Sequence, residues 1–197
     1  LMGMGHGATH WIAATFTILL PLITEDLGLS YTEAGLLYSI FYVSSFAANL
    51  GSGVVVDVTG RKVIFQILSL VIGAGALAVF GVTGLYLVLA AMVALIGATN
   101  NLWHPPAIAF ISERYPDHRG YALSIHATGA SVGDMIAPSL VGLLLITFSW
   151  QGAAAVSTLP VFLVALIFVF YLMPMDRPEP GIARKSMGVR EYFSGLA

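Results

Sequence analysis

Six long hydrophobic runs, separated by short polar connections, make up most of this chain. Each run is long enough to cross the hydrocarbon core of a bilayer as a helix, which takes about 20 apolar residues. We therefore expect an all-α membrane protein with six transmembrane helices in one bundle. The expected helices cover residues 3–23, 30–56, 62–80, 85–112, 121–148 and 153–173.

The two ends of the chain differ from this pattern. After residue 173, three prolines interrupt the sequence and charged residues return. We expect a six-helix bundle over residues 1–173 and the start of a cytoplasmic loop over residues 174–197. The chain opens inside its first hydrophobic run, with no basic region or cleavage site typical of a signal peptide, which indicates an incomplete start.

Local motifs predict where several helices begin, end or bend. Ser30-Tyr31-Thr32-Glu33 has the spacing of a capping box at the start of the second helix. Gly60 suits the turn that ends this helix, because glycine adopts a positive φ at low cost. Gly53 is expected to let another backbone approach closely. The pair Pro105-Pro106 is expected to bend the fourth helix.

Composition agrees with a membrane protein. The chain is 58% hydrophobic and 9% charged, and its mean hydropathy is +0.90. A soluble domain is about 25% charged. Cysteine is absent from the sequence, so it has no disulfide framework and no thiolate metal site.

The basic residues predict the orientation of the bundle. The six-helix arrangement places every Lys and Arg on one side, and the connections on the other side have none. Cytoplasmic loops carry an excess of such residues, so both ends of this chain are expected in the cytoplasm. The eight basic residues are Arg61, Lys62, Arg114, Arg119, Arg177, Arg184, Lys185 and Arg190.

Polar residues within the runs predict which helices line an interior. An ionisable side chain in hydrocarbon costs about 2.5–3.5 kcal/mol on insertion scales, so it usually faces protein or water. We expect the first, fourth and fifth helices to face inward and the third and sixth to lie outside, with Trp103 facing the interior. The inward candidates are His6, His10, Asn100, Asn101, His104, His126 and Asp134.

Asp134 is the strongest candidate for a functional group. It lies about 20 Å along its helix, at about 1.5 Å per residue, and no Lys or Arg occupies that depth. Loss of hydration disfavours the charged carboxylate, so we expect Asp134 to hold a proton in a closed cavity and to release it when water enters. The alternative is a neutral or hydrogen-bonded acid that packs helices together.

Histidines form a second group of candidates. His6 and His10 share one helix face, as do Asn100 and His104, while His126 lies on a face that adjoins that of Asp134. Each can bind substrate or relay protons, although a buried histidine bonded to a backbone carbonyl is more common. A histidine pair can also bind metal, but no third ligand is evident and we expect none. His118 lies in a polar loop and is expected to be solvated.

Several motifs together resemble one transporter family. Gly53, Asp57, Gly60, Arg61 and Lys62 fit the signature loop between helices two and three of the major facilitator superfamily, although Val58 stands where that family usually has a base. Glu113 to Gly120 resembles its loop between helices four and five. Gly129, Gly133, Ala137, Pro138 and Gly142 resemble the helix-five motif of its exporters, with Ala137 in place of glycine. The segment from Asn101 to Pro105 resembles fosmidomycin-resistance exporters.

This resemblance implies the first half of a twelve-helix protein, with a second six-helix half in the same chain. It also implies that Asp57 faces a helix N-terminus of that second half and that the base of the loop, Arg61, pairs with Glu113. Such contacts would hold the cytoplasmic side closed. The stripe formed by Gly129, Gly133 and Ala137 is interpreted as ordinary helix packing.

The predicted function is therefore secondary transport of a small organic solute by alternating access, coupled to protons, in a bacterial inner membrane. The alternative is a six-helix scaffold or sensor that does not transport, but deep polar groups have no evident use in an anchor. An intramembrane enzyme would need a nucleophile or a metal set, and the sequence has no such motif. We expect no cofactor and no nucleic-acid partner.

Overall fold

Helices form nearly all of residues 1–176, the part of the chain that the computed structural model describes. Six stretches are long and apolar enough to cross a membrane, as predicted. The fourth stretch is divided into α4 and α5, and the sixth continues from α7 through a π-helical and a 3-10 turn. The α-helices are α1 (Met2–Asp26), α2 (Tyr31–Thr59), α3 (Lys62–Phe80), α4 (Tyr86–Leu102), α5 (His104–Arg114), α6 (Arg119–Thr147) and α7 (Trp150–Ile167).

Helix ends follow the predicted local chemistry. The Ser30 hydroxyl accepts a hydrogen bond from Glu33 N at 3.2 Å, and the Glu33 carboxylate accepts one from Ser30 N at 2.8 Å, which completes the capping box. Gly60 ends α2 with φ of 62°, in the left-handed region, and α3 begins two residues later. The chain therefore reverses here within a few residues, as expected.

The fourth span breaks between α4 and α5. Pro105 and Pro106 occupy the first turn of α5, where their missing N–H groups leave no helical hydrogen bond unmade. The break falls at Trp103 and leaves His104 as the first residue of the new helix. A histidine and its neighbouring backbone are thereby placed at an interruption inside the span.

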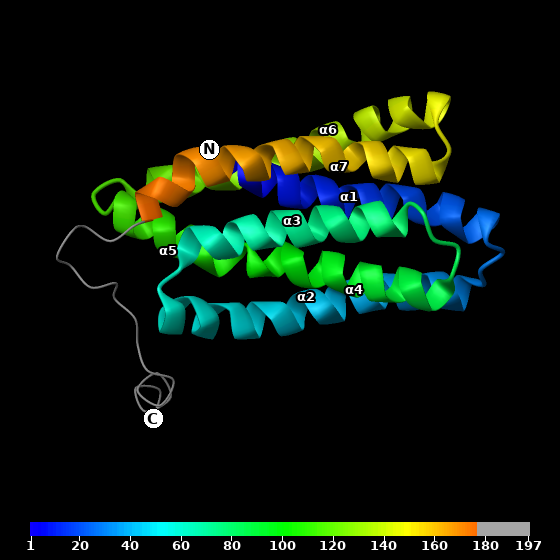
Figure 1. Ribbon diagram of the computed structural model, residues 1–197, viewed down its shortest axis with the longest axis horizontal. Helices are drawn as coiled ribbons and strands as arrows, with labels where there is room; N and C mark the ends of the chain where they lie inside the picture. Colours follow the sequence, from blue (N-terminus) through cyan, green and yellow to red (C-terminus); the bar gives the residue numbers. More distant parts are fainter. Residues whose placement is uncertain (177–197) are drawn as a thin grey trace.

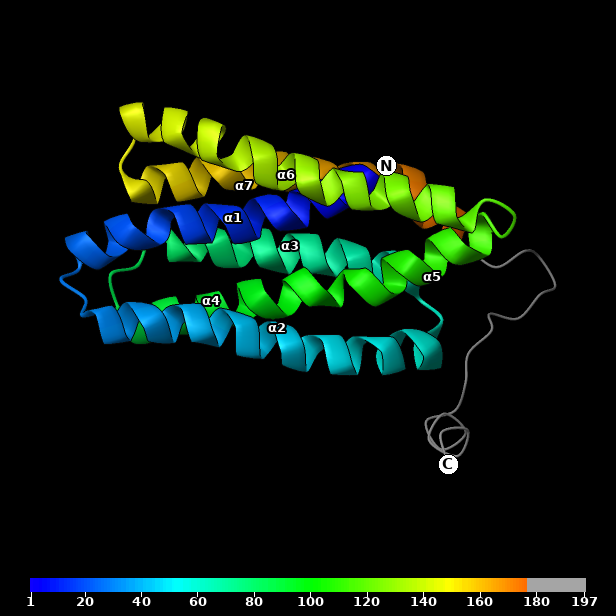
Figure 2. The same cartoon turned by 180° about the vertical axis from the view of Figure 1, so that it is seen from behind.

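The spans lie side by side with their axes roughly parallel (Figure 1). Helix α1 packs mainly on α6, α2 packs on α4, and α3 packs on α4 and α7. Helices α2 and α4 form one edge and α6 and α7 the other, with α1 and α3 between them. The face seen in Figure 2 presents α6, α1, α4 and α2, whereas α3 lies behind them.

The core is built from large apolar side chains. Phe16 of α1 and Phe80 of α3 are fully buried and meet edge to face. Trp103 is also fully buried and lies against Phe168 with ring centroids 5.4 Å apart. The expectation that Trp103 faces the interior cavity is therefore wrong, because the break in the fourth span turns this ring toward the end of the sixth.

The connection between α2 and α3 and the connection between α5 and α6 lie at the same end of the bundle (Figure 1). All of the described basic residues lie in or directly beside these two connections, and they are Arg61, Lys62, Arg114 and Arg119. The other predicted cytoplasmic bases, Arg177, Arg184, Lys185 and Arg190, lie outside the described residues, as does nearly all of the loop expected over residues 174–197.

Candidate functional site

A cavity of about 520 Å³ opens within the membrane-spanning part of the bundle. It is lined by residues of α1, α2, α4 and α6, and none of its lining residues comes from the described parts of α3 or α7. The predicted inward helices therefore line it, together with α2, which the sequence did not single out. The lining residues are His10, Ala13, Ala14, Thr17, Ile18, Tyr38, Phe41, Tyr42, Ser45, Asn100, Asn101, Asp134 and Pro138.

Helix α2 contributes hydroxyl groups to this cavity. Tyr38 and Tyr42 lie one turn apart, with their hydroxyl oxygens 3.2 Å from each other. Ser45, one turn further along, accepts a hydrogen bond from the Asn101 side chain. Ionisable groups and amides indicated the inward helices, whereas these three hydroxyl residues were not predicted from the sequence. Their spacing at 38, 42 and 45 on one helical face was the available signal.

Asp134 has a partner within this half of the bundle. Its Oδ2 lies 3.0 Å from Nδ1 of His10 in α1, and the two side chains are 56% and 27% exposed. The expectation of an unpaired carboxylate is therefore wrong. That expectation considered only Lys and Arg as partners, whereas histidine supplies either a neutral N–H or a positive charge.

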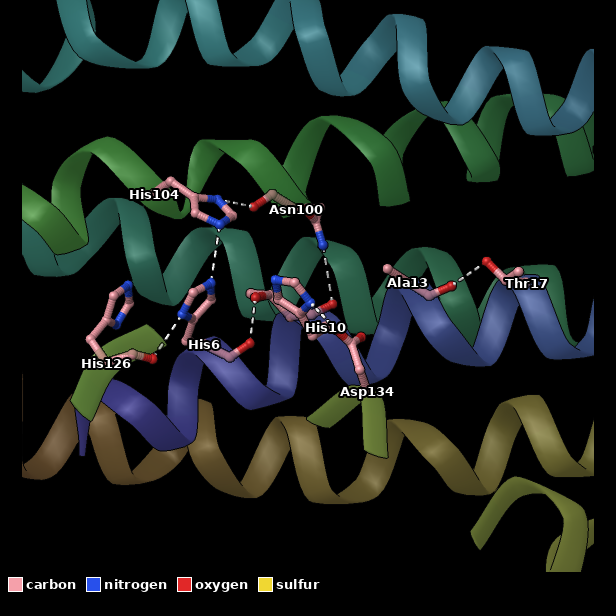
Figure 3. Close-up of polar contacts among 9 residues, drawn as sticks. His6, His10, Ala13, Thr17, Asn100, His104, His126 and Asp134 are labelled. Carbon is pink, nitrogen blue, oxygen red and sulfur yellow. Dashed lines mark hydrogen bonds and ion pairs between the residues drawn. The ribbon is translucent and has the colours of Figure 1, made fainter. Parts of the chain in front are cut away.

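Three further histidines adjoin this pair (Figure 3). Nδ1 of His6 lies 2.9 Å from the backbone oxygen of His126, and Nε2 of His6 lies 3.1 Å from Nε2 of His104. The ring of His126 stacks on that of His6 with centroids 4.1 Å apart. Nδ1 of His104 lies 3.0 Å from the backbone oxygen of Asn100.

The two predicted histidine faces thus meet across the helix interface. Each of His6, His10 and His104 offers one ring nitrogen, and these nitrogens lie within 4.8 Å of one another. No third metal ligand was evident from the sequence, and the helix packing supplies one. His118 remains apart from this group, exposed in the connection before α6.

At the basic end of the bundle, the ion pair differs from the one that the family resemblance implied. Glu113 Oε2 lies 2.9 Å from Nζ of Lys62, not beside Arg61. Lys62 is the first residue of α3 and Arg61 precedes the helix, exposed. Asp57 is also exposed, and its side chain makes no hydrogen bond or ion pair within residues 1–176.

Glycines of α6 form the interface with α1. A Cβ added to Gly129 would lie 2.6 Å from Cα of Gly3, and one added to Gly133 would lie 3.0 Å from Cα of Gly7. Gly3 and Gly7 repeat the four-residue spacing in α1, so the sequence holds a matching signal on the partner helix. This supports the interpretation of the stripe as helix packing.

Other members of the glycine motifs do not pack in this way. Within the described residues, a Cβ added to Gly142 or Gly53 would meet nothing within 4 Å. The close approach expected at Gly53 is therefore not made by this part of the chain. Pro138 lies in the cavity wall and Ala137 is fully buried.

Comparisons with known proteins agree with this architecture. The Major Facilitator Superfamily profile matches residues 2–195. The chain is 28% identical to the hexuronate transporter of Bacillus subtilis (strain 168), over 85% of this chain and 39% of that protein. It is 29% identical to the multidrug resistance protein MdtG of Dickeya zeae (strain Ech586), over 93% of this chain and 46% of that protein.

A solved structure shows the same fold. A chain of tetrameric PepTSo2, crystallised in space group I4, superposes with a TM-score of 0.73 at 19% identity, covering 99% of this chain and 46% of that one. The chain thus spans less than half the length of these relatives. With a profile match over residues 2–195 and six membrane-length helices in this arrangement, the chain belongs to the Major Facilitator Superfamily.

Proposed function

We propose that the complete protein is a secondary transporter that moves a small organic solute across the membrane by alternating access. The observation that carries this proposal is the cavity of about 520 Å³ with His10, Asn100 and Asp134 in its wall. Polar and ionisable groups at this depth are costly unless they face protein or water, and they mark substrate and ion pathways. A scaffold or sensor has no such need for them.

The cavity is completed by a second six-helix half in the same chain. Transporters of this kind place the substrate between two related halves that rock against each other. The relatives are more than twice as long as the matched part of this chain, which supports a second half. The exposed side chains of Tyr42 and Asp134 would then line a site shared by both halves.

Proton coupling is carried by Asp134 in this proposal. The carboxylate lies in the cavity wall, well inside a span, and contacts His10. A carboxylate and an imidazole in contact can exchange a proton, and water that enters the open cavity can receive that proton, whereas closure removes this water. A bound solute that changes this hydration couples proton movement to its own transport.

The orientation follows from the basic residues. The end that carries Arg61, Lys62, Arg114 and Arg119 faces the cytoplasm, in accord with the excess of bases in cytoplasmic loops. The start of the first span and the end of the sixth span then both lie on the cytoplasmic side. The bacterial origin of the relatives supports the inner membrane as the location.

Contacts at the cytoplasmic end control opening. Lys62 and Glu113 join the start of α3 to the end of α5, and Asp57 is exposed in the last turn of α2. A carboxylate is favoured at a helix N-terminus by about 0.3–1 kcal/mol, so a helix of the second half is a suitable partner for Asp57. Breaking these contacts opens the cytoplasmic side.

Transport by the purified complete protein in liposomes tests this proposal. Hexuronates come first among the solutes, because one relative is a hexuronate transporter, and a panel of small organic cations and anions follows, because another is a multidrug resistance protein. We expect saturable accumulation of at least one solute that collapses when the proton gradient is dissipated. Binding without movement of any solute would support the scaffold or sensor.

A further inference from the structure

The arrangement of the histidine cluster suits the binding of a metal ion as well as of a proton. His6 and His10 lie one turn apart on α1, and His104 lies at the break between α4 and α5. One ring nitrogen from each lies within 4.8 Å of the other two. Figure 3 shows the three rings converging, with Asp134 on the far side of His10.

Each of the three rings is held by its Nδ1 atom. The partners are the backbone oxygen of His126 for His6, the backbone oxygen of Asn100 for His104, and the Asp134 carboxylate for His10. A carbonyl oxygen or an ionised carboxylate only accepts, so each Nδ1 carries the hydrogen. Each neutral ring is then left with a lone pair on Nε2, the atom that can bind a metal.

Two of these lone pairs face each other. Nε2 of His6 and Nε2 of His104 are 3.1 Å apart, and with both hydrogens already on Nδ1, neither neutral ring has a proton to donate to the other. A cation bound by both nitrogens removes this repulsion. Ligand bonds of about 2.0–2.1 Å to zinc in a tetrahedral site separate two nitrogens by about 3.3 Å, close to the observed spacing.

We propose that His6, His10 and His104 bind one divalent transition-metal ion of the class of Zn²⁺ and Co²⁺. Neutral imidazole suits these ions, and metal-bound histidines usually donate their other ring N–H to a carbonyl or carboxylate, as all three do here. His10 also lines the cavity, so a fourth position opens toward the solute. Three protein ligands with one open position are typical of sites where a ligand exchanges.

This site goes beyond the proposed transport and does not depend on it. The ion is held by the bundle itself, so binding is measurable without transport. Binding is tested with the purified complete protein in detergent at one fixed pH, because protons compete with metal for the same nitrogens. Zn²⁺ is titrated against a chromophoric chelator, and Co²⁺ is titrated while its visible absorption is recorded.

We expect one ion per chain and intense visible bands from Co²⁺ of low coordination number. His6→Gln and His104→Gln should each abolish stoichiometric binding. Asp134→Asn should weaken it by about 10–100-fold, the usual effect of removing a group that orients a ligand. His118→Gln is the matched control, because His118 lies exposed in a connection away from the cluster, and it should leave affinity unchanged.

Gel filtration and thermal unfolding without metal show whether each variant is folded. The Co²⁺ spectrum of the parent protein tests the site even if one variant does not fold. The proposal is overturned if the parent binds no stoichiometric ion, or if His6→Gln and His104→Gln bind as the parent does. If the parent protein binds the ion but transports no solute, the proposed function is contradicted and the metal site is not.

Discussion

Asp134 of α6 and His10 of α1 join two helices through a contact of 3.0 Å between Oδ2 and Nδ1, in the wall of the central cavity. The two residues are 124 positions apart in the chain. An acid and an imidazole in contact can share or exchange a proton, and their exposure of 56% and 27% lets water reach them from the cavity.

The first prediction concerns this pair. Asp134→Asn keeps the shape of the side chain and a hydrogen-bonding partner for His10, but it cannot exchange a proton. We expect accumulation driven by a proton gradient to be lost, while exchange of solute across the membrane without a gradient persists. Uptake is measured in liposomes with and without an imposed pH difference. An Asp134→Asn protein that responds fully to the gradient would assign Asp134 a structural role.

A second variant separates the roles of the partners. His10→Gln retains a hydrogen-bond donor for Asp134 and removes the imidazole. If His10 only orients the carboxylate, gradient-driven uptake should survive at a reduced rate, whereas Asp134→Asn abolishes it. Equal losses in the two variants, measured in the same uptake assay, would show that the pair exchanges the proton as a unit.

The second prediction concerns the cytoplasmic end. Asp57→Asn, Lys62→Gln and Glu113→Gln should each slow transport, because each removes a contact that closes this end. Their effect on stability should be small, about 0.2–1 kcal/mol, since the Glu113 side chain is 68% exposed and water screens its contact with Lys62, whose side chain is 15% exposed. The measurements are transport rate and thermal unfolding. If all three variants transport at the rate of the parent protein, these residues are surface charges without a role in closing this end.

The double variant Lys62→Gln/Glu113→Gln extends this test. If the two side chains act through their mutual contact, the double variant should lose no more than the slower single variant. Arg61→Gln is the control for charge alone, because Arg61 lies next to Lys62 but is not the residue paired with Glu113. A loss with Arg61→Gln equal to that with Lys62→Gln would restore the pairing that the family resemblance implied.

The third prediction concerns the interface of α1 and α6. Gly129→Ala and Gly133→Ala should destabilise the bundle by about 1–3 kcal/mol, because the added Cβ meets the backbone of Gly3 or Gly7 and the helices must move apart. Gly142→Ala on the same helix meets nothing within 4 Å and should be neutral or stabilising. Unfolding in mixed detergent micelles compares the three. Equal stability of all three variants would contradict the close crossing.

The fourth prediction concerns orientation. The 197 residues contain no cysteine, so single cysteines can be introduced in the connections, after replacement of any in the rest of the complete protein. Tyr31 and Val82 are highly exposed at the end of the bundle without bases, and His118 is exposed at the basic end. A membrane-impermeant thiol reagent added to intact cells should label Tyr31→Cys and Val82→Cys but not His118→Cys. The reverse pattern would invert the orientation.

The sequence by itself determined the local features of this protein. The six spans follow from the length of the apolar runs, and the start of α3 at Lys62 was predicted to the residue. The capping box at Ser30 and the left-handed turn at Gly60 depend on hydrogen bonds and backbone angles within a few residues. The family itself was also evident from short motifs, because its signature loop is local in the chain.

Only the tertiary structure decided which side chains meet. It brought His10 to Asp134, His6 to His104, and Lys62 rather than Arg61 to Glu113. The physical reason is that lipid tails are as apolar as leucine, so a hydrophobic helix face has no strong preference between lipid and a neighbouring helix. Hydrophobic periodicity therefore does not set the rotation of a membrane helix. Close packing does, as where Gly129 and Gly133 meet Gly3 and Gly7, and that packing draws the cavity and the histidines together.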